Sequence, residues 1–82
     1  MSIPGHSAQA IACLQESIDA FREHGDRFSE AETLTLLGDT RHATGNPQAA
    51  RRDWEVALDI LSEVRHPDAS QVRARLSSLG NP

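Results

Sequence analysis

The fold is decided by residues 29–64, SEAETLTLLGDTRHATGNPQAARRDWEVALDILSEV, which contain two helix starts. Ser29 is followed three residues later by Glu32, the spacing of a capping box in which each side chain bonds the other residue's backbone amide. Asn46 and Pro47 place a favoured N-cap residue before a proline at the first helical position, where the missing N–H costs nothing. The stretch therefore predicts two consecutive helices joined by a short turn.

The segments on either side carry the same kind of signal. Gly25 supplies a left-handed C-terminal cap for a preceding helix, and Asp68 with Gln71 repeats the capping-box spacing for a following one. No stretch alternates apolar and polar residues as a half-buried strand would. Because the connections are short, neighbouring helices should pack antiparallel. The sequence predicts an all-α fold with helices over about 7–24, 29–44, 47–64 and 68–79.

Apolar and small residues recur every three or four positions in each predicted helix, which places them on one face. These faces are expected to form the core. In chain order the positions are Ala10, Leu14, Ser17, Ile18, Phe21, Ala31, Leu34, Leu37, Gly38, Arg41, Ala50, Trp54, Ala57, Leu58, Leu61, Val64, Ala69, Val72, Leu76 and Leu79.

Length and composition predict one small domain with a thin core. The 82 residues have a mass of 8.9 kDa and are 38% hydrophobic. A chain of this size buries only about 60% of its unfolded surface. The single cysteine, Cys13, excludes an internal disulfide, and we expect it to be a small buried hydrophobe.

Charge and hydropathy exclude some partners. Twelve acidic residues against eight arginines give a net charge of −4, which argues against a nucleic-acid or anionic-membrane surface. Arg51-Arg52 and Arg73-x-Arg75, the two basic clusters, are interpreted as solvated faces. The N-terminus lacks a secretory signal and no stretch is apolar enough to span a membrane, so a cytoplasmic location is expected.

The chain resembles itself when it is shifted by about half its length. At an offset of 40, Leu14 falls on Trp54, and at an offset of 42 the pattern Leu34-x-x-Leu37-Gly38 falls on Leu76-x-x-Leu79-Gly80. The first and third helices are thus of one type, and the second and fourth of another. A generic four-helix bundle with accidental self-similarity is the alternative.

A helix with Leu-x-x-Leu-Gly followed by one with Ala-x3-aromatic-x2-Ala resembles the tetratricopeptide repeat family. The resemblance implies that the paired helices approach closely at the small residues Gly38 and Ala50. It also implies that Trp54 fills the space between the two helices and that the next repeat packs on Ala57. Two departures are Arg41, where the family has an aromatic residue, and the closing proline, displaced to Pro67. The matching positions are Leu34, Leu37, Gly38, Ala50, Trp54, Ala57, Leu76, Leu79 and Gly80.

Repeats of 40–42 residues joined by Gly25-Asp26-Arg27 resemble the C-terminal repeats of actinobacterial antibiotic-regulatory-protein-type transcription regulators. This resemblance implies a single helical domain over 1–82. Within it, 5–25 is the second helix of one repeat, 29–65 a complete repeat, and 68–80 the first helix of the next.

No residue pattern indicates catalysis. The histidines form no helical metal-ligand pair, and phosphate loops, nucleophile elbows and paired-carboxylate motifs are absent from the sequence. We therefore expect no enzyme activity, no metal and no cofactor.

Family members usually bind peptides along the concave face made by the first helix of each pair. The matching positions here are Glu32, Thr35, Asp39, His42, Ala74 and Ser77. Because Glu32 and Asp39 stand where the chaperone-binding members carry cations, a basic or neutral partner is expected, and capture of acidic C-termini is not.

The sequence therefore predicts a non-catalytic protein-interaction module from a larger regulator, binding a protein, a peptide or other domains of its parent chain. The alternative is a free-standing small helical protein that acts through homo-oligomerisation. Since the first and last helices lack repeat partners, they should expose apolar surface through which the isolated chain associates.

Overall fold

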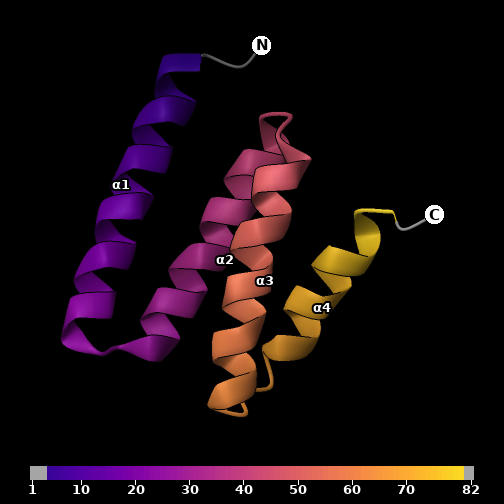
Figure 1. Cartoon of the computed structure of the whole chain (residues 1–82). Helices are drawn as coiled ribbons and strands as arrows, with labels where there is room; N and C mark the ends of the chain where they lie inside the picture. The colour runs from indigo at the N-terminus through magenta and orange to yellow at the C-terminus, as the bar shows by residue number, and fades with distance from the viewer. Residues whose placement is uncertain (1–3, 81–82) are drawn as a thin grey trace.

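The computed structural model describes residues 4–80, with side chains described from Ser7 onward. The predicted domain bounds 1–82 include residues 1–3 and 81–82, which lie outside this range. Within it the chain forms four α-helices, and the predicted all-α class is confirmed. Figure 1 shows successive helices running in opposite directions. They are α1 (Pro4–His24), α2 (Arg27–Ala43), α3 (Pro47–Glu63) and α4 (Ala69–Ser78).

The first two helices begin earlier than predicted. Helix α1 starts at Pro4 rather than Ser7, with proline in the first turn, where it is tolerated. Helix α2 starts at Arg27, because Asp26 and not Ser29 is the N-cap: the Asp26 carboxylate accepts the Ser29 N–H at 3.2 Å. The predicted capping box is therefore wrong. Asp26 is an equally good capping residue and lies one turn earlier.

The start of α3 is confirmed, whereas the cap of α4 is not. The Asn46 side chain accepts the Ala49 N–H at 3.3 Å, and Pro47 takes the first helical position. Asp68 precedes α4 but makes no side-chain cap, so its predicted capping box with Gln71 does not form. The Asp68 backbone is already helical, and its N–H donates to Nδ1 of His66 at 3.1 Å.

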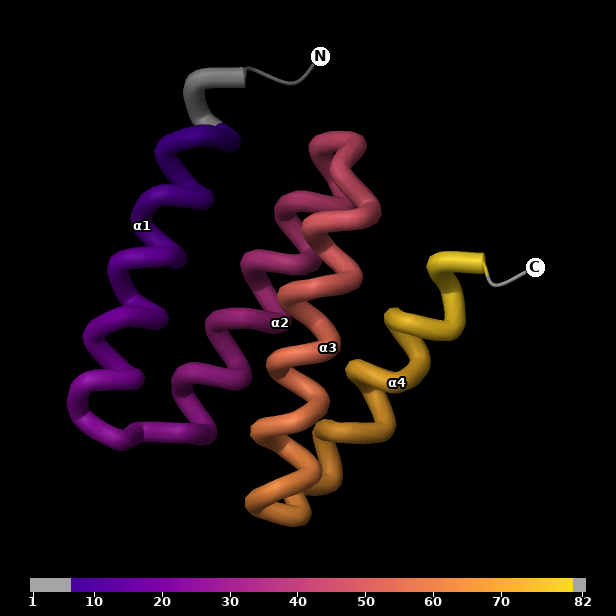
Figure 2. The backbone as a smooth tube through the Cα atoms, in the orientation of Figure 1, coloured from indigo at the N-terminus to yellow at the C-terminus, as the bar shows by residue number. Residues whose placement is uncertain are grey.

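Each helix packs on its neighbours in the chain: α1 on α2, α2 on α3, and α3 on α4. Figure 2 shows the resulting row, with α1 and α4 at its two sides. The Cα atoms span 38 × 35 × 15 Å, so the molecule is a flat slab. The central pair, α2 and α3, contributes most of the buried side chains.

The core lies where α2 crosses α3. Leu34, Leu37 and Gly38 of α2 and Ala50, Trp54 and Ala57 of α3 are all buried. Trp54 lies directly against Gly38, and its indole Nε1–H donates to the carbonyl of Thr35 at 3.2 Å. Leu76 of α4 and the C-cap residue Leu79 are half-buried against this core, and Gly80 follows at φ +75°.

The outer helices bury less than predicted. Of the expected stripe on α1, only Ile18 is fully buried, and Ala10, Ser17 and Cys13 are exposed. The expectation that Cys13 is buried is therefore wrong. The physical reason is that α1 packs on α2 alone, so a narrower face of α1 is covered than of the central helices.

The exposed large apolar side chains also differ from prediction. In the described part of the chain they lie on α2, on α3 and at the residue that ends α3, and none lies on α1 or α4. The large apolar side chains of α1 and α4 are half-buried or buried rather than fully exposed, and association through these helices remains a prediction. The four exposed side chains are Phe28, Leu36, Val56 and Val64.

Candidate protein-binding groove

A groove of about 230 Å³ runs between α2 and α4, with α3 as its floor. On α2 its lining residues recur every three or four positions, so they share one face of the helix. The same spacing recurs at the start of α4. The lining residues are Phe28, Glu32, Thr35, Leu36, Asp39, Leu61, Asp68, Gln71, Val72 and Arg75; we call this surface the α2–α4 groove.

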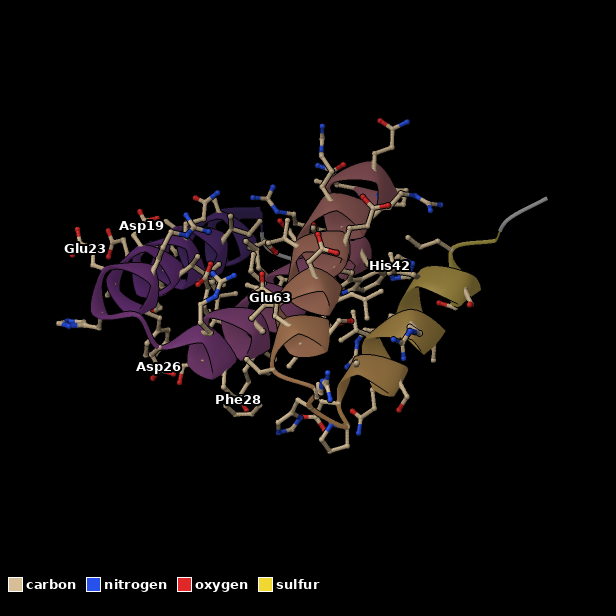
Figure 3. All side chains as sticks on the ribbon, turned by 60° about the horizontal axis from the view of Figure 1, so that its bottom comes forward. Asp19, Glu23, Asp26, Phe28, His42 and Glu63 are labelled. Carbon is tan, nitrogen blue, oxygen red and sulfur yellow. The ribbon has the colours of Figure 1, made fainter. Side chains whose placement is uncertain are left out.

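Three of the six predicted partner-binding residues, Glu32, Thr35 and Asp39, line the groove. His42 lies one turn beyond it, with its ring 5.7 Å from the indole of Trp54 (Figure 3). The binding role of all these residues remains a prediction.

On α4 the groove is formed by residues other than those predicted. Ala74 and Ser77 are exposed and do not line it, whereas Gln71, Val72 and Arg75 do. One signal in the sequence indicates this face: Gln71, Val72 and Arg75 follow Asp68 at helical spacing.

An ion pair spans one end of the groove. Arg75 of α4 donates to both carboxylate oxygens of Asp39 on α2, Nε to Oδ1 at 2.8 Å and Nη2 to Oδ2 at 3.2 Å. This hydrogen bonding raises the pKa of Arg75 above its ordinary value, while burial opposes the shift. The pair satisfies the charge of Asp39 and connects two helices that are not consecutive in the chain.

The other end of the groove combines acidic and apolar side chains. Glu32 is exposed and forms no ion pair or side-chain hydrogen bond with any other described residue. Phe28 is 37% exposed and packs on the ring of His66, with centroids 4.6 Å apart. Leu36 is 52% exposed beside the buried Leu61 and Val72. Such a surface can accept apolar and basic side chains of another chain.

A second polar cluster, which the sequence analysis missed, joins α1, α2 and α3. Glu30 is 1% exposed, and its carboxylate accepts hydrogen bonds from Arg22 of α1 and Arg27 of α2, each at 3.0 Å. Arg27 also reaches Glu63 of α3 at 2.9 Å (Figure 3). One signal in the sequence could have indicated that Glu30 is buried. Glu30 lies four residues before Leu34, which places it on the apolar face of α2. This cluster links the three helices and holds the buried carboxylate of Glu30 between two guanidinium groups.

A further ion pair joins α2 to α3 at their other ends. Nε of Arg41 lies 2.8 Å from Oδ2 of Asp53, in a contact that is not aligned as a hydrogen bond. Burial raises the pKa of Asp53, and the charge of Arg41 opposes this shift. Arg41 is predicted as a core-stripe residue, and in the structure it is half-buried beside Asp53.

Among the residues described, no group of three or more His, Cys, Asp or Glu side chains is arranged to hold a metal ion. None of the described helices is both long and apolar enough to cross a membrane.

The architecture is therefore an all-helical array with a groove on one face, and comparison with known proteins adds a relative. The chain is 33% identical over 73 residues to the regulatory protein AfsR of Streptomyces griseus. The match covers 89% of this chain but 8% of that protein, so the chain spans less than a tenth of its relative. No family model matches the sequence, and no solved structure matches the fold. The chain is thus similar to one segment of a regulatory protein, and its assignment to the tetratricopeptide repeats remains a prediction.

Proposed function

We propose that this chain is a non-catalytic protein-interaction module of a larger cytoplasmic transcription regulator, and that the α2–α4 groove is its binding surface. The groove itself is the observation that carries the proposal. At about 230 Å³ it is smaller than the roughly 300–1,000 Å³ of small-molecule pockets. It suits one or two side chains of a protein partner better than an enclosed metabolite.

The helix arrangement supports a tetratricopeptide-like interpretation of this module. In the proposed division, α2 and α3 form the complete repeat over 29–65, and the segments 5–25 and 68–80 are halves of its neighbours. Burial of Gly38, Ala50 and Trp54 in the central pair agrees with the packing that the division requires. The similarity to a segment of AfsR supports a place within a longer regulator.

A binding selection tests the proposal directly. A display library of random twelve-residue peptides is selected on the purified chain, and the enriched peptides are titrated by calorimetry. Leu36→Gln alters an exposed side chain of the groove, and Val56→Gln alters one on α3 that does not line it. Burying a leucine contributes about 1.5–3 kcal/mol, so Leu36→Gln should weaken binding at least tenfold. Val56→Gln should leave it unchanged.

Two outcomes would contradict the proposal. The first is a selection in which no peptide is enriched. The second is enriched peptides that bind the Leu36→Gln chain as tightly as the parent. Light scattering on the same samples measures self-association, and a dimer that forms with rising concentration while no peptide binds would favour the homo-oligomer alternative.

A further inference from the structure

We infer that the α2–α4 groove takes a basic-aliphatic segment, in which an arginine or lysine is followed at short spacing by a large aliphatic side chain. The inference rests on the proposed function and names the chemistry of the partner. It follows from the unequal distribution of charge along the groove. The acidic end is defined here by Phe28, Glu32 and Asp68, and the closed end by Asp39 and Arg75.

The closed end has no charge to offer a ligand. Arg75 and Asp39 meet through two hydrogen bonds of 2.8 and 3.2 Å, and their side chains are 34% and 38% exposed. An acidic partner would have to displace Asp39 from Arg75, the one cation among the lining residues. A basic partner would meet the guanidinium. Both kinds of charge are therefore disfavoured at this end.

The acidic end offers two carboxylates. No described residue forms an ion pair with Glu32. Asp68 Oδ2 lies 3.7 Å from Nδ1 of His66, and that nitrogen accepts the Asp68 N–H at 3.1 Å instead of donating to the carboxylate. A guanidinium or ammonium group placed at this end of the groove would be attracted by these carboxylates, and its aliphatic stem can lie along Phe28.

An aliphatic site lies one turn from this end. Leu36 follows Glu32 by four residues on α2, which is about 6 Å along the helix axis. Its side chain is 52% exposed, and the floor beside it is the buried Leu61 and Val72. Two residues of an extended chain, or one turn of a helix, span the same 6 Å or so. The partner's basic and aliphatic residues should therefore be two apart if extended, or three to four apart if helical.

The composition of the selected peptides tests this inference. Peptides enriched from the twelve-residue library should carry Arg or Lys at this spacing from Leu, Ile or Met. Replacing that basic residue by Gln should weaken binding about fivefold, and replacing it by Glu should weaken it further. Glu32→Gln and Asp68→Asn should each cost a similar factor, whereas the matched control Glu16→Gln on α1 should cost none.

Arg75→Gln supplies a test in which the affinity for the basic peptide should rise instead of fall. It frees Asp39, so the basic peptide should bind a few-fold tighter, whereas loss of a merely structural contact would weaken it. Circular dichroism shows whether this variant folds, and if it does not, the exposed Glu32→Gln decides.

The outcomes separate this inference from the proposed function. Enriched peptides that need Leu36 but are acidic or uncharged would overturn the inference and leave the interaction module standing. Unchanged affinity in Glu32→Gln and Asp68→Asn would do the same. A library that yields no binder overturns both.

Discussion

The contact between Gly38 and Trp54 makes a sharp prediction for Gly38→Ala. A Cβ built on Gly38 would lie 2.5 Å from Cδ1 and 2.9 Å from Cε2 of the indole, inside any ordinary carbon contact of about 3.5–4.0 Å. The ring would have to shift by about 1 Å. Trp54 is 3% exposed and its Nε1–H is bonded to Thr35, so it has little room to move.

The net effect of Gly38→Ala is a balance of three contributions. Alanine favours a helix interior over glycine by about 1 kcal/mol. Overpacking of a filled core costs about 1–3 kcal/mol, and weakening the Trp54–Thr35 hydrogen bond costs about 1 kcal/mol more. We expect net destabilisation of about 1–3 kcal/mol, although the substitution improves helix propensity.

Urea unfolding followed by far-UV circular dichroism measures this effect. The control is the difference in stability between Glu32→Ala and Glu32→Gly. Because Glu32 is exposed on the same helix, this difference reports the helix propensities of alanine and glycine alone. In a Trp54→Phe background the Nε1 contact and its hydrogen bond are gone but a ring carbon remains near Gly38, so Gly38→Ala should destabilise less than in the parent. A contradicting result would be that Gly38→Ala raises the free energy of unfolding by as much as the Glu32→Ala and Glu32→Gly variants differ. Trp54 would then not limit the approach of α2 to α3.

Three further variants probe the core and its ion pairs. Trp54→Ala should cost about 3–5 kcal/mol and abolish a cooperative thermal melt; a melt near the parent temperature would contradict this. Arg22→Ala with Arg27→Ala strips both partners from buried Glu30 and should lower the urea midpoint by more than the two single substitutions together; a strictly additive loss would contradict this. Asp53 has a raised pKa in the folded state, so its contribution to stability is complete below the ordinary carboxyl pKa of about 3.9 and is lost as pH rises through the raised value. Asp53→Asn should therefore flatten the decline in melting temperature from about pH 4 upward, and parallel melts with an unchanged decline would count against it.

The sequence specified the helices well because their signals are local. The sequence Asn46-Pro47 and the three-to-four spacing each fix a helix without reference to distant residues. The start of α2 differs from the prediction because Asp26 and Ser29 are both good N-caps, and local sequence does not distinguish them.

The groove was harder to predict because it depends on contacts between distant residues. The face that α4 presents brings Arg75 against Asp39, 36 positions earlier, and no local pattern reports that pairing. On α1, the repeat pattern suggested burial of Ala10 and Ser17 that requires a neighbour on its far side. Periodicity identifies a face that could be buried, and only the surrounding helices determine how much of it is.

Packing of each helix on its chain neighbours also bears on how the molecule opens. With contacts mostly between consecutive helices, the chain has short loops to close and should fold fast. Ile18 is the one described α1 side chain that is fully buried, whereas α2 and α3 share the densest packing. Amide hydrogen exchange should therefore be graded, with α1 and α4 detaching and reattaching while the central pair stays closed. Such partial opening would let either outer helix exchange partners without unfolding of the whole chain.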